Sequence, residues 1–171
     1  MTHNLQQDPP GAQHVRTERL LLRPFTAEEI EAVIDGVSLE HFAQGFPIPE
    51  SVDQLKDIAQ AGGYFFTETM YSALACIEVE TGLVIGSTGF AAAPIEGALE
   101  IVGFLAPESR RRGFAAEGLA ALTALAFADS HVTVIRASVP QDNQHIEDLL
   151  VDAGFTKSEA VGPEAEYRMN R

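Results

Sequence analysis

Cysteine is almost missing from this chain of 171 residues, because Cys76 is its single example. One thiol excludes an internal disulfide and a cysteine-rich zinc site, and it favours a reducing compartment. Cys76 stands in an apolar run typical of a strand, so we expect a buried and unreactive thiol. We expect no metal site.

A secretion signal and a membrane-spanning run are also missing. The N-terminus has neither a charged-then-apolar pattern nor an apolar stretch long enough to cross a bilayer. We therefore expect a cytoplasmic protein with no membrane partner. Residues 1–15 are polar and include Pro9-Pro10-Gly11, which indicates a flexible tail, and residues 16–171 are expected to form one domain. The sequence leaves a monomer and a homodimer equally open.

Positive charge is scarce, with 11 Lys and Arg against 25 Asp and Glu and a formal net charge of −14. Eleven cations cannot form a broad basic face, which argues against nucleic acid as a partner. The acidity is compatible with a cationic substrate such as an amine, although it also favours solubility.

Three of these few cations stand together, as Arg110–Arg112, directly before Gly113. The apolar run 99–105 precedes them and a long apolar-striped segment to Asp129 follows, which predicts a strand, a loop and a helix. A helix start has unpaired N–H groups and the positive end of the macrodipole, so it binds anions. Gly113 and the small Ala115 leave the backbone open to a ligand, and arginine forks suit phosphate oxygens.

The local chemistry therefore predicts a ligand that carries phosphate, the alternative being an ordinary helix start with solvated arginines. The dinucleotide fingerprint Gly-x-Gly-x-x-Gly is absent, and so is the Gly-Lys-Ser/Thr sequence of nucleotide-binding P-loops.

The rest of the pattern predicts an α+β fold with about six or seven strands of mixed direction and four helices. Capping boxes at Thr26–Glu29 and Ser51–Gln54 should begin two helices, residues 113–129 should form the third, and Asp142-Asn143 should begin a fourth that ends at Gly154. Strands are expected at residues 19–23, 71–80, 83–91, 97–105, 134–139, 155–160 and 165–169.

The spacing of Arg110, Gly113 and Ala115 resembles the Gln/Arg-x-x-Gly-x-Gly/Ala loop of the GNAT acetyltransferases. Residues 17–25, Leu99-Glu100-Ile101, and Asn143 with Gly154-Phe155 also resemble the RimJ/RimL-like branch of that family. The resemblance implies the GNAT fold, with a central sheet splayed between the fourth and fifth expected strands, 97–105 and 134–139.

The resemblance further implies that an acetyl group moves from acetyl-CoA to a primary amine by direct attack. The acceptor would be a protein N-terminus or a small amine. A backbone N–H near Phe104 is expected to polarise the thioester carbonyl, and Gly103 to ease a distortion of the strand. The residues expected to hold acetyl-CoA are Phe104, Leu105, Ala106, Arg110, Arg111, Arg112, Gly113, Phe114, Ala115 and Asn143.

Glu100 is the candidate general base, because it is a charge in an apolar strand where burial would raise its proton affinity. The alternative is that it faces solvent. The family positions that supply a proton to the leaving thiolate fall on Leu150 and Ile146, which cannot donate one. His145 is the candidate in their place unless it is a surface histidine, and Ser138 and Tyr167 are weaker candidates.

Two functions therefore stay open from the sequence. The chain is a working N-acetyltransferase, or it is a non-catalytic or weakly active GNAT-fold module that binds acyl-CoA. A third possibility is a different ligand that carries phosphate.

Overall fold

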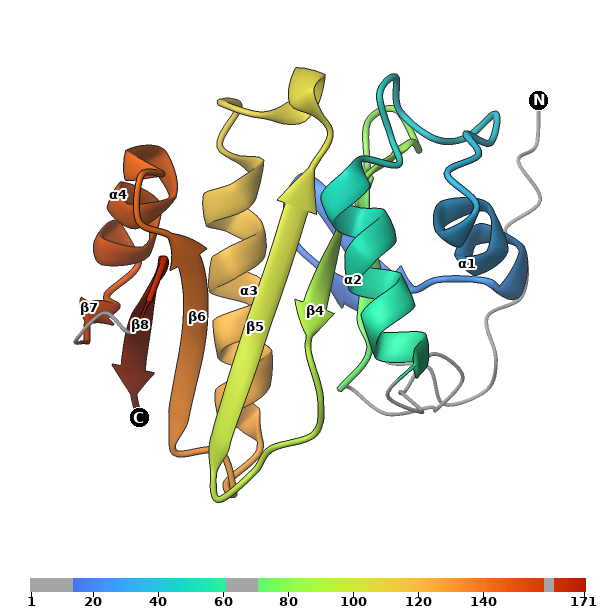
Figure 1. The fold of residues 1–171 in the computed structure, drawn as a ribbon. Helices are drawn as coiled ribbons and strands as arrows, with labels where there is room; N and C mark the ends of the chain where they lie inside the picture. Colours follow the sequence, from blue (N-terminus) through green and yellow to red (C-terminus); the bar gives the residue numbers. More distant parts are fainter. Residues whose placement is uncertain (1–13, 61–70, 159–161) are drawn as a thin grey trace.

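The computed structural model describes residues 14–60, 71–158 and 162–171 (Figure 1). Most of the predicted tail lies outside the described residues. The same is true of Gly62-Gly63, where the sequence predicts the end of the second helix. The helices are α1 (Ala27–Ile34), α2 (Pro49–Gln60), α3 (Phe114–Ala128) and α4 (Gln144–Asp152), with a short 3₁₀ helix at Pro107–Ser109. The strands are β1 (Val15–Arg16), β2 (Leu20–Pro24), β3 (Ala73–Glu78), β4 (Val84–Phe90), β5 (Ala98–Leu105), β6 (Val134–Pro140), β7 (Thr156–Lys157) and β8 (Glu164–Asn170).

The strands form one mixed sheet in the order β1-β2-β3-β4-β5-β6-β8-β7. Neighbours are antiparallel except β5 and β6, which are parallel because the crossover helix α3 joins them. The α+β prediction is confirmed. The structure adds β1, whose two residues are too few to give a periodic signal and which we had assigned partly to the tail.

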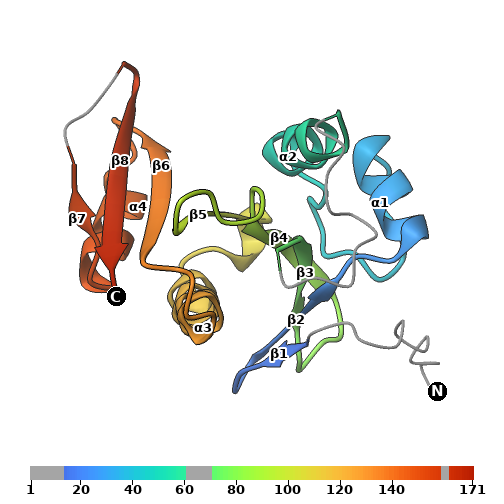
Figure 2. The ribbon, with the colours of Figure 1, turned by 90° about the horizontal axis from the view of Figure 1, so that it is seen from below.

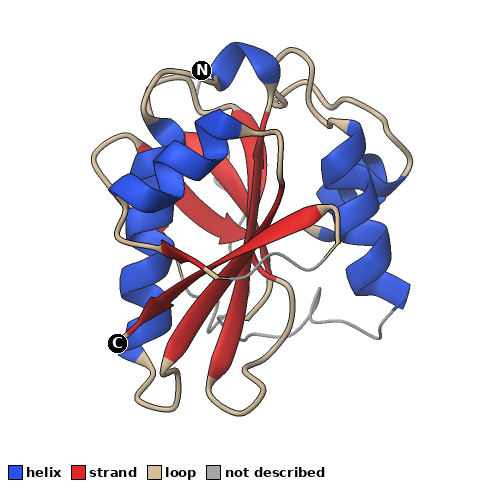
Figure 3. Ribbon diagram, turned by 60° about the vertical axis from the view of Figure 1, so that its left-hand side comes forward, coloured by secondary structure: helices blue, strands red, loops and turns tan. Residues whose placement is uncertain are grey.

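Helices lie on both faces of the sheet (Figure 2). α3 and α4 cover one face, and their apolar residues share a core with Leu99 and Ile101 of β5 and with Ile135 of β6. α1 and α2 cover the other face over β3 and β4, where a second core forms. In the secondary-structure view the twisted strands fan out between the two groups of helices (Figure 3).

The second helical pair leaves part of its face open. Side chains of β5, β6 and β8 alternate across the sheet, so Glu100, Arg136 and Glu166 stand on the side opposite α3. On this side Figure 2 shows no helix over β6 and β8 among the described residues. A ligand can therefore approach the sheet from this side.

The capping box at the start of α1 is confirmed, and it is tied to the sheet by a buried carboxylate. Thr26 Oγ1 accepts from the Glu29 N–H, and the Thr26 N–H donates to Glu29 Oε2 at 2.8 Å. Arg23 of β2 donates to both oxygens of Glu29, and His41 Nε2 lies 2.8 Å from Oε1. Glu29 therefore connects α1, β2 and the segment after α1.

The second predicted capping box is wrong. α2 begins at Pro49, so Ser51 already lies inside the helix. Ser51 Oγ lies 2.8 Å from Ser87 Oγ of β4, and Ser87 donates to Gln54 Oε1 at 3.1 Å. Proline can start a helix because its missing N–H would have no partner there. The Ser-x-x-Gln spacing therefore serves contact with the sheet and not capping.

Cys76 is buried, as predicted, with 4% of its surface exposed. Burial and the nearby Glu117 charge raise the pKa of its thiol to about 12, so it stays protonated and unreactive. None of the described helices is long and apolar enough to cross a membrane.

We predict that Glu29→Gln destabilises the fold by about 3 kcal/mol at pH 7, the usual scale for breaking a buried ion pair. Burial alone would raise the pKa of Glu29, but Arg23, the Thr26 N–H and His41 together lower it below its ordinary 4.5. A carboxyl group with a lowered folded pKa stabilises the protein above pH 4.5 and loses this contribution as pH falls through the lowered value. Urea unfolding at several pH values measures both effects.

The exposed neighbour Glu28 is the matched control, because Glu28→Gln removes the same charge from the same helix turn. Equal losses of stability in the two variants would show that the Arg23 and His41 contacts of Glu29 contribute nothing.

Candidate functional site

The parallel strands β5 and β6 separate after three residue pairs. The register runs from Ala98 opposite Val134 to Glu100 opposite Arg136, and the remainder of each strand has no partner across the gap. The predicted splay is therefore confirmed. Unpaired backbone groups at such a gap can bind an extended ligand that carries amide groups.

The register also says which backbone groups of β5 face the gap. The Glu100 carbonyl accepts from Ala91, and the Ala106 N–H donates to Ile85, so the even-numbered residues are directed toward β4. Backbone direction alternates along a strand, so the N–H groups of Gly103 and Leu105 face β6. The N–H of Phe104 itself lies on the β4 side, so the expected polarising N–H near Phe104 would be that of Gly103 or Leu105, which stays a prediction.

β5 is regular opposite β4, with no register shift at Gly103. The expected easing by Gly103 concerns the opening toward β6, and it stays a prediction. A Cβ at Gly103 would lie 3.1 Å from Thr88 Oγ1, so its glycine serves close packing against β4.

The predicted anion-binding loop lies between β5 and α3. Arg111 and Gly113 have φ values of 59° and 83°, both left-handed, and Gly113 caps α3 without a side-chain hydrogen bond. Left-handed residues in a short turn make successive N–H groups converge, and this arrangement attracts anions. The first N–H groups of α3, including those of Phe114 and Ala115, point out of the helix start toward the same region.

The arginines of this loop have different partners. Arg112 donates to Glu78 Oε1 at 2.5 Å, and its guanidinium lies 4.6 Å from the Phe114 ring centre. Arg110 Nε donates to the Leu105 carbonyl at 3.0 Å. Arg111 is exposed and has no side-chain partner among the described residues. Arg111 is thus the best placed of the three to meet a phosphate, and phosphate binding by each of them stays a prediction.

Arg19 of the β1–β2 turn is a site residue that the sequence did not single out. Its guanidinium lies 4.7 Å from the Phe114 ring centre, on the ring that Arg112 also contacts, and it donates to the Arg112 carbonyl at 2.8 Å. Glu117 of α3 accepts from Arg19 Nε at 2.7 Å. No local pattern marks this pairing, because its partners are separated by almost a hundred residues.

Glu100 lies where the two strands part, and its side chain is exposed on the open face of the sheet. Burial of its carboxyl group and the charges of Glu164 and Glu166 raise its pKa, while Ser138 and Arg136 act in the opposite direction. Glu100 therefore faces solvent, as the alternative prediction had it. Its pKa is nevertheless raised, which suits a base, and its role as the base stays a prediction.

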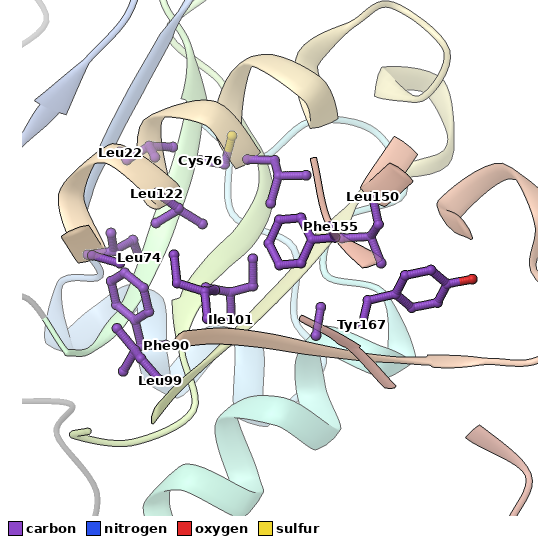
Figure 4. Packing of buried hydrophobic residues seen from close by; sticks show 14 of the residues in the cluster. Leu22, Leu74, Cys76, Phe90, Leu99, Ile101, Leu122, Leu150, Phe155 and Tyr167 are labelled. Atoms are coloured by element: carbon purple, nitrogen blue, oxygen red, sulfur yellow. The ribbon is translucent and has the colours of Figure 1, made fainter. Parts of the chain in front are cut away.

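The start of α4 lies on the other side of the gap. Leu150 is buried and Ile146 packs against the same core. Both side chains are hydrocarbon, so neither can donate a proton. His145 is exposed, and Asn143 Oδ1 accepts from the Ile146 N–H at 3.4 Å as the helix cap. Tyr167 directs its hydroxyl away from the core (Figure 4), where burial and Glu147 raise its pKa. Catalysis by His145 and ligand binding by Asn143 stay predictions.

A cleft of about 510 Å³ lies between α2 and β5. It is lined by Glu50, Asp53, Gln54, Asp57, Ile58, Ala91, Val102 and Phe104. Val102 and Phe104 alternate with the core residues of β5, so they share the open face of the sheet with Glu100. The α2 residues are not among those predicted for the site. The available signal was three acidic residues at spacings of three and four, which lie on one helix face.

Comparisons with known proteins agree with this geometry. Residues 19–156 match the family described as acetyltransferase (GNAT) domain. The uncharacterized N-acetyltransferase YoaA of Bacillus subtilis (strain 168) is 27% identical over 146 residues, which cover 84% of this chain and 82% of that protein.

Two solved structures show the likeness of fold. An acetyltransferase from Agrobacterium tumefaciens str. C58 superposes with a TM-score of 0.67 and 25% identity, over 98% of each chain. RimL, a ribosomal L7/L12 alpha-N-protein acetyltransferase in complex with coenzyme A, superposes with a TM-score of 0.64 and 15% identity, over 92% of this chain and 98% of that one.

We predict that Arg112→Ala lowers the free energy of unfolding by about 1–2 kcal/mol, because it leaves a buried carboxylate without its charged partner. Glu78 keeps its hydrogen bond from Thr81 at 2.9 Å, which limits the loss. Arg111→Ala is the control and should leave stability within about 0.5 kcal/mol of the wild type, as is usual for exposed positions. Equal unfolding midpoints for the two variants in urea would contradict the anchoring role.

Proposed function

The chain belongs to the GNAT acetyltransferases, and we propose that it transfers the acetyl group of acetyl-CoA to a primary amine, on a protein N-terminus or a small molecule, by direct attack. The observation that carries the proposal is the parting of β5 and β6, which begins at Glu100 and opens toward the loop at Gly113. In this proposal the β5 backbone meets the thioester arm of acetyl-CoA, the Gly113 loop meets its phosphates, and Glu100 supplies the base.

The residues of the loop fit the phosphates of acetyl-CoA. The left-handed Gly113 offers no side chain, and a Cβ there would already lie 3.1 Å from Arg19 Nη2. The N–H groups at the start of α3 supply donors to a pyrophosphate, as does the Arg111 side chain, which has no partner among the described residues. The N–H groups of β5 that face the gap pair with the amides of the pantetheine arm, and Asn143 lies across the gap at the start of α4.

Acetyl-CoA supplies an activated thioester, and the chain supplies the proton transfers around it. Glu100 accepts a proton from the ammonium form of the acceptor, directly or through water. The amine nitrogen then forms a bond to the carbonyl carbon, and the carbon–sulfur bond breaks with its electron pair on sulfur. The N–H of Gly103 or Leu105 stabilises the developing negative charge on the carbonyl oxygen.

The leaving thiolate receives its proton from the attacking amine or from water. Ile146 and Leu150 present hydrocarbon at the places where the family has its acid, and this favours slow turnover when the sulfur must leave as a free thiolate. The same observation supports the second candidate, an acyl-CoA-binding protein with weak activity.

Within the family we assign the chain to the RimJ/RimL-like branch. Residues 17–25 support this assignment because Arg19 of that segment contacts Phe114 and Glu117 of the cofactor helix.

We predict that Gly113→Glu weakens coenzyme A binding at least about tenfold, measured by calorimetry. The substitution places a negative charge where the pyrophosphate lies, beside a helix start that otherwise attracts anions. Gly113→Ala is the matched control, because it brings the same strain at φ 83° without the charge. Equal coenzyme A affinities for the two variants would contradict the assignment of the Gly113 loop to the pyrophosphate.

We predict that Glu100→Gln lowers kcat on the order of 10²–10⁴-fold and leaves coenzyme A affinity unchanged, since a base acts on the amine proton and not on the cofactor. The wild-type kcat/KM should rise with pH through the raised pKa of Glu100, because the base must be deprotonated. Release of free coenzyme A thiol gives the rates.

Glu166→Gln provides the control for that pH profile. It removes one of the charges that raise the pKa of Glu100, so the acidic limb of kcat/KM should move to lower pH. Full activity in Glu100→Gln, or an unmoved limb in Glu166→Gln, would show that another group is the base.

A further inference from the structure

The cleft between α2 and β5 has two unlike walls. Ile58, Ala91, Val102 and Phe104 form an apolar lining, and three carboxylates, Glu50, Asp53 and Asp57, line it from α2. Apolar surface suits methylene groups, and carboxylates suit ammonium groups. The cleft therefore matches a ligand in which both kinds of group alternate.

The three carboxylates are exposed, and none of them forms an ion pair or a side-chain hydrogen bond with another described residue. Lys56 of the same helix is not among the residues that line the cleft. Glu50 and Asp57 are seven residues apart, which corresponds to about 10 Å along a helix. An extended chain with two or three amino groups has a comparable length.

A buried amide beside these carboxylates gives independent support for a ligand. Gln54 lines the cleft with only 9% of its surface exposed, and its Nε2 has no hydrogen-bond partner among the described residues. Its Oε1 accepts from Ser87 Oγ, which lies 2.8 Å from Ser51 Oγ. Buried polar groups without partners are rare in folded proteins, and a ligand is one way to satisfy them.

The amide can meet an ammonium group by turning over. Either serine hydroxyl can be the donor in the Ser51–Ser87 contact, so Ser87 can also accept from Gln54 Nε2. The amide oxygen then takes the buried place of Nε2 without a donor, and a shift of the side chain toward the cleft lets it accept from a ligand N–H. Gln54 can thus bind the same group that the three carboxylates attract.

We propose that the acceptor is a linear aliphatic diamine or polyamine, whose non-reacting ammonium group is held by Glu50, Asp53, Gln54 and Asp57 in this cleft. The proposal rests on the proposed N-acetyltransferase function. The reacting amine lies toward Glu100, two residues from Val102 and on the same face of β5, about 7 Å along the strand. One end of the molecule is thus recognised by charge while the other end is acetylated.

The first experiment compares acceptors that differ in the second charge. Purified protein with acetyl-CoA is given spermidine, 1,4-diaminobutane, butylamine or 4-amino-1-butanol, and the released thiol is measured. We expect the two polycationic acceptors to have a kcat/KM at least about tenfold above that of butylamine, the value of one partly shielded ion pair and its hydrogen bonds. The amino alcohol should behave like butylamine, because it has the length without the charge.

The second experiment removes charge from the cleft. Asp53→Asn/Asp57→Asn should raise the KM for spermidine about tenfold with kcat within about threefold, and should leave the KM for butylamine unchanged. Asp35→Asn/Asp152→Asn is the matched control, since it removes two exposed carboxylates elsewhere and changes the net charge equally. A structural defect would lower kcat for every acceptor.

The outcomes separate the two proposals. Equal kcat/KM for butylamine and spermidine, or a peptide with a free N-terminus that exceeds spermidine tenfold, would overturn the cleft assignment and leave N-acetyltransfer intact. No thiol release with any amine would count against the proposed function. In that case, calorimetric titration of spermidine into the coenzyme A-bound protein still tests the cleft assignment. The assignment is overturned if spermidine does not bind, or if it binds equally to the cleft and control variants.

Discussion

The separation of β5 and β6 is the constraint on which the rest of this molecule depends. Three parallel residue pairs hold the two halves of the sheet together, and beyond Glu100 the backbone of both strands is left without its partner. An open ladder of this kind costs stability unless something occupies it. The fold compensates by packing α3 and α4 over one face, with Leu99, Ile135 and Leu122 in a continuous core. The gap is thus held open by a core beneath it and can admit a cofactor without unfolding any strand.

Four of the 11 basic residues, Arg19 and Arg110–Arg112, lie at the loop before α3. Arg19 and Arg112 both contact the ring of Phe114, and each also pairs with a carboxylate, Glu117 or Glu78. These contacts fix the start of α3 against β2 and β3, so the N–H groups of the helix are held in place before a ligand arrives. Arg111 remains unpaired among the described side chains. Most of the arginine charge near the loop therefore builds the site, and only part of it is left for the ligand.

The open face carries several acidic side chains beside Arg136. The charges of Glu164 and Glu166 raise the pKa of Glu100 on the sheet, and the acidic residues of α2 stand across the cleft. Acidic side chains attract cations. The acceptor that we propose would therefore meet negative charge on this face, whereas the anionic cofactor would meet the loop at Gly113.

The sequence by itself determined the order of strands and helices, the Thr26–Glu29 cap, and the loop of Gly113, because each depends on residues a few positions apart. It singled out Glu100 as a charge within an apolar strand, and the structure puts this residue at the last pair of β5 with β6. Tertiary structure alone decided that Ser51 and Gln54 contact Ser87 and do not cap α2, that Arg19 and Arg112 contact one aromatic ring, and that the Phe104 N–H faces β4. Local hydrogen bonds and periodicity depend on residues that are neighbours in the sequence. Strand register and side-chain pairing depend on how distant segments pack, and a single sequence carries no local signal for this packing.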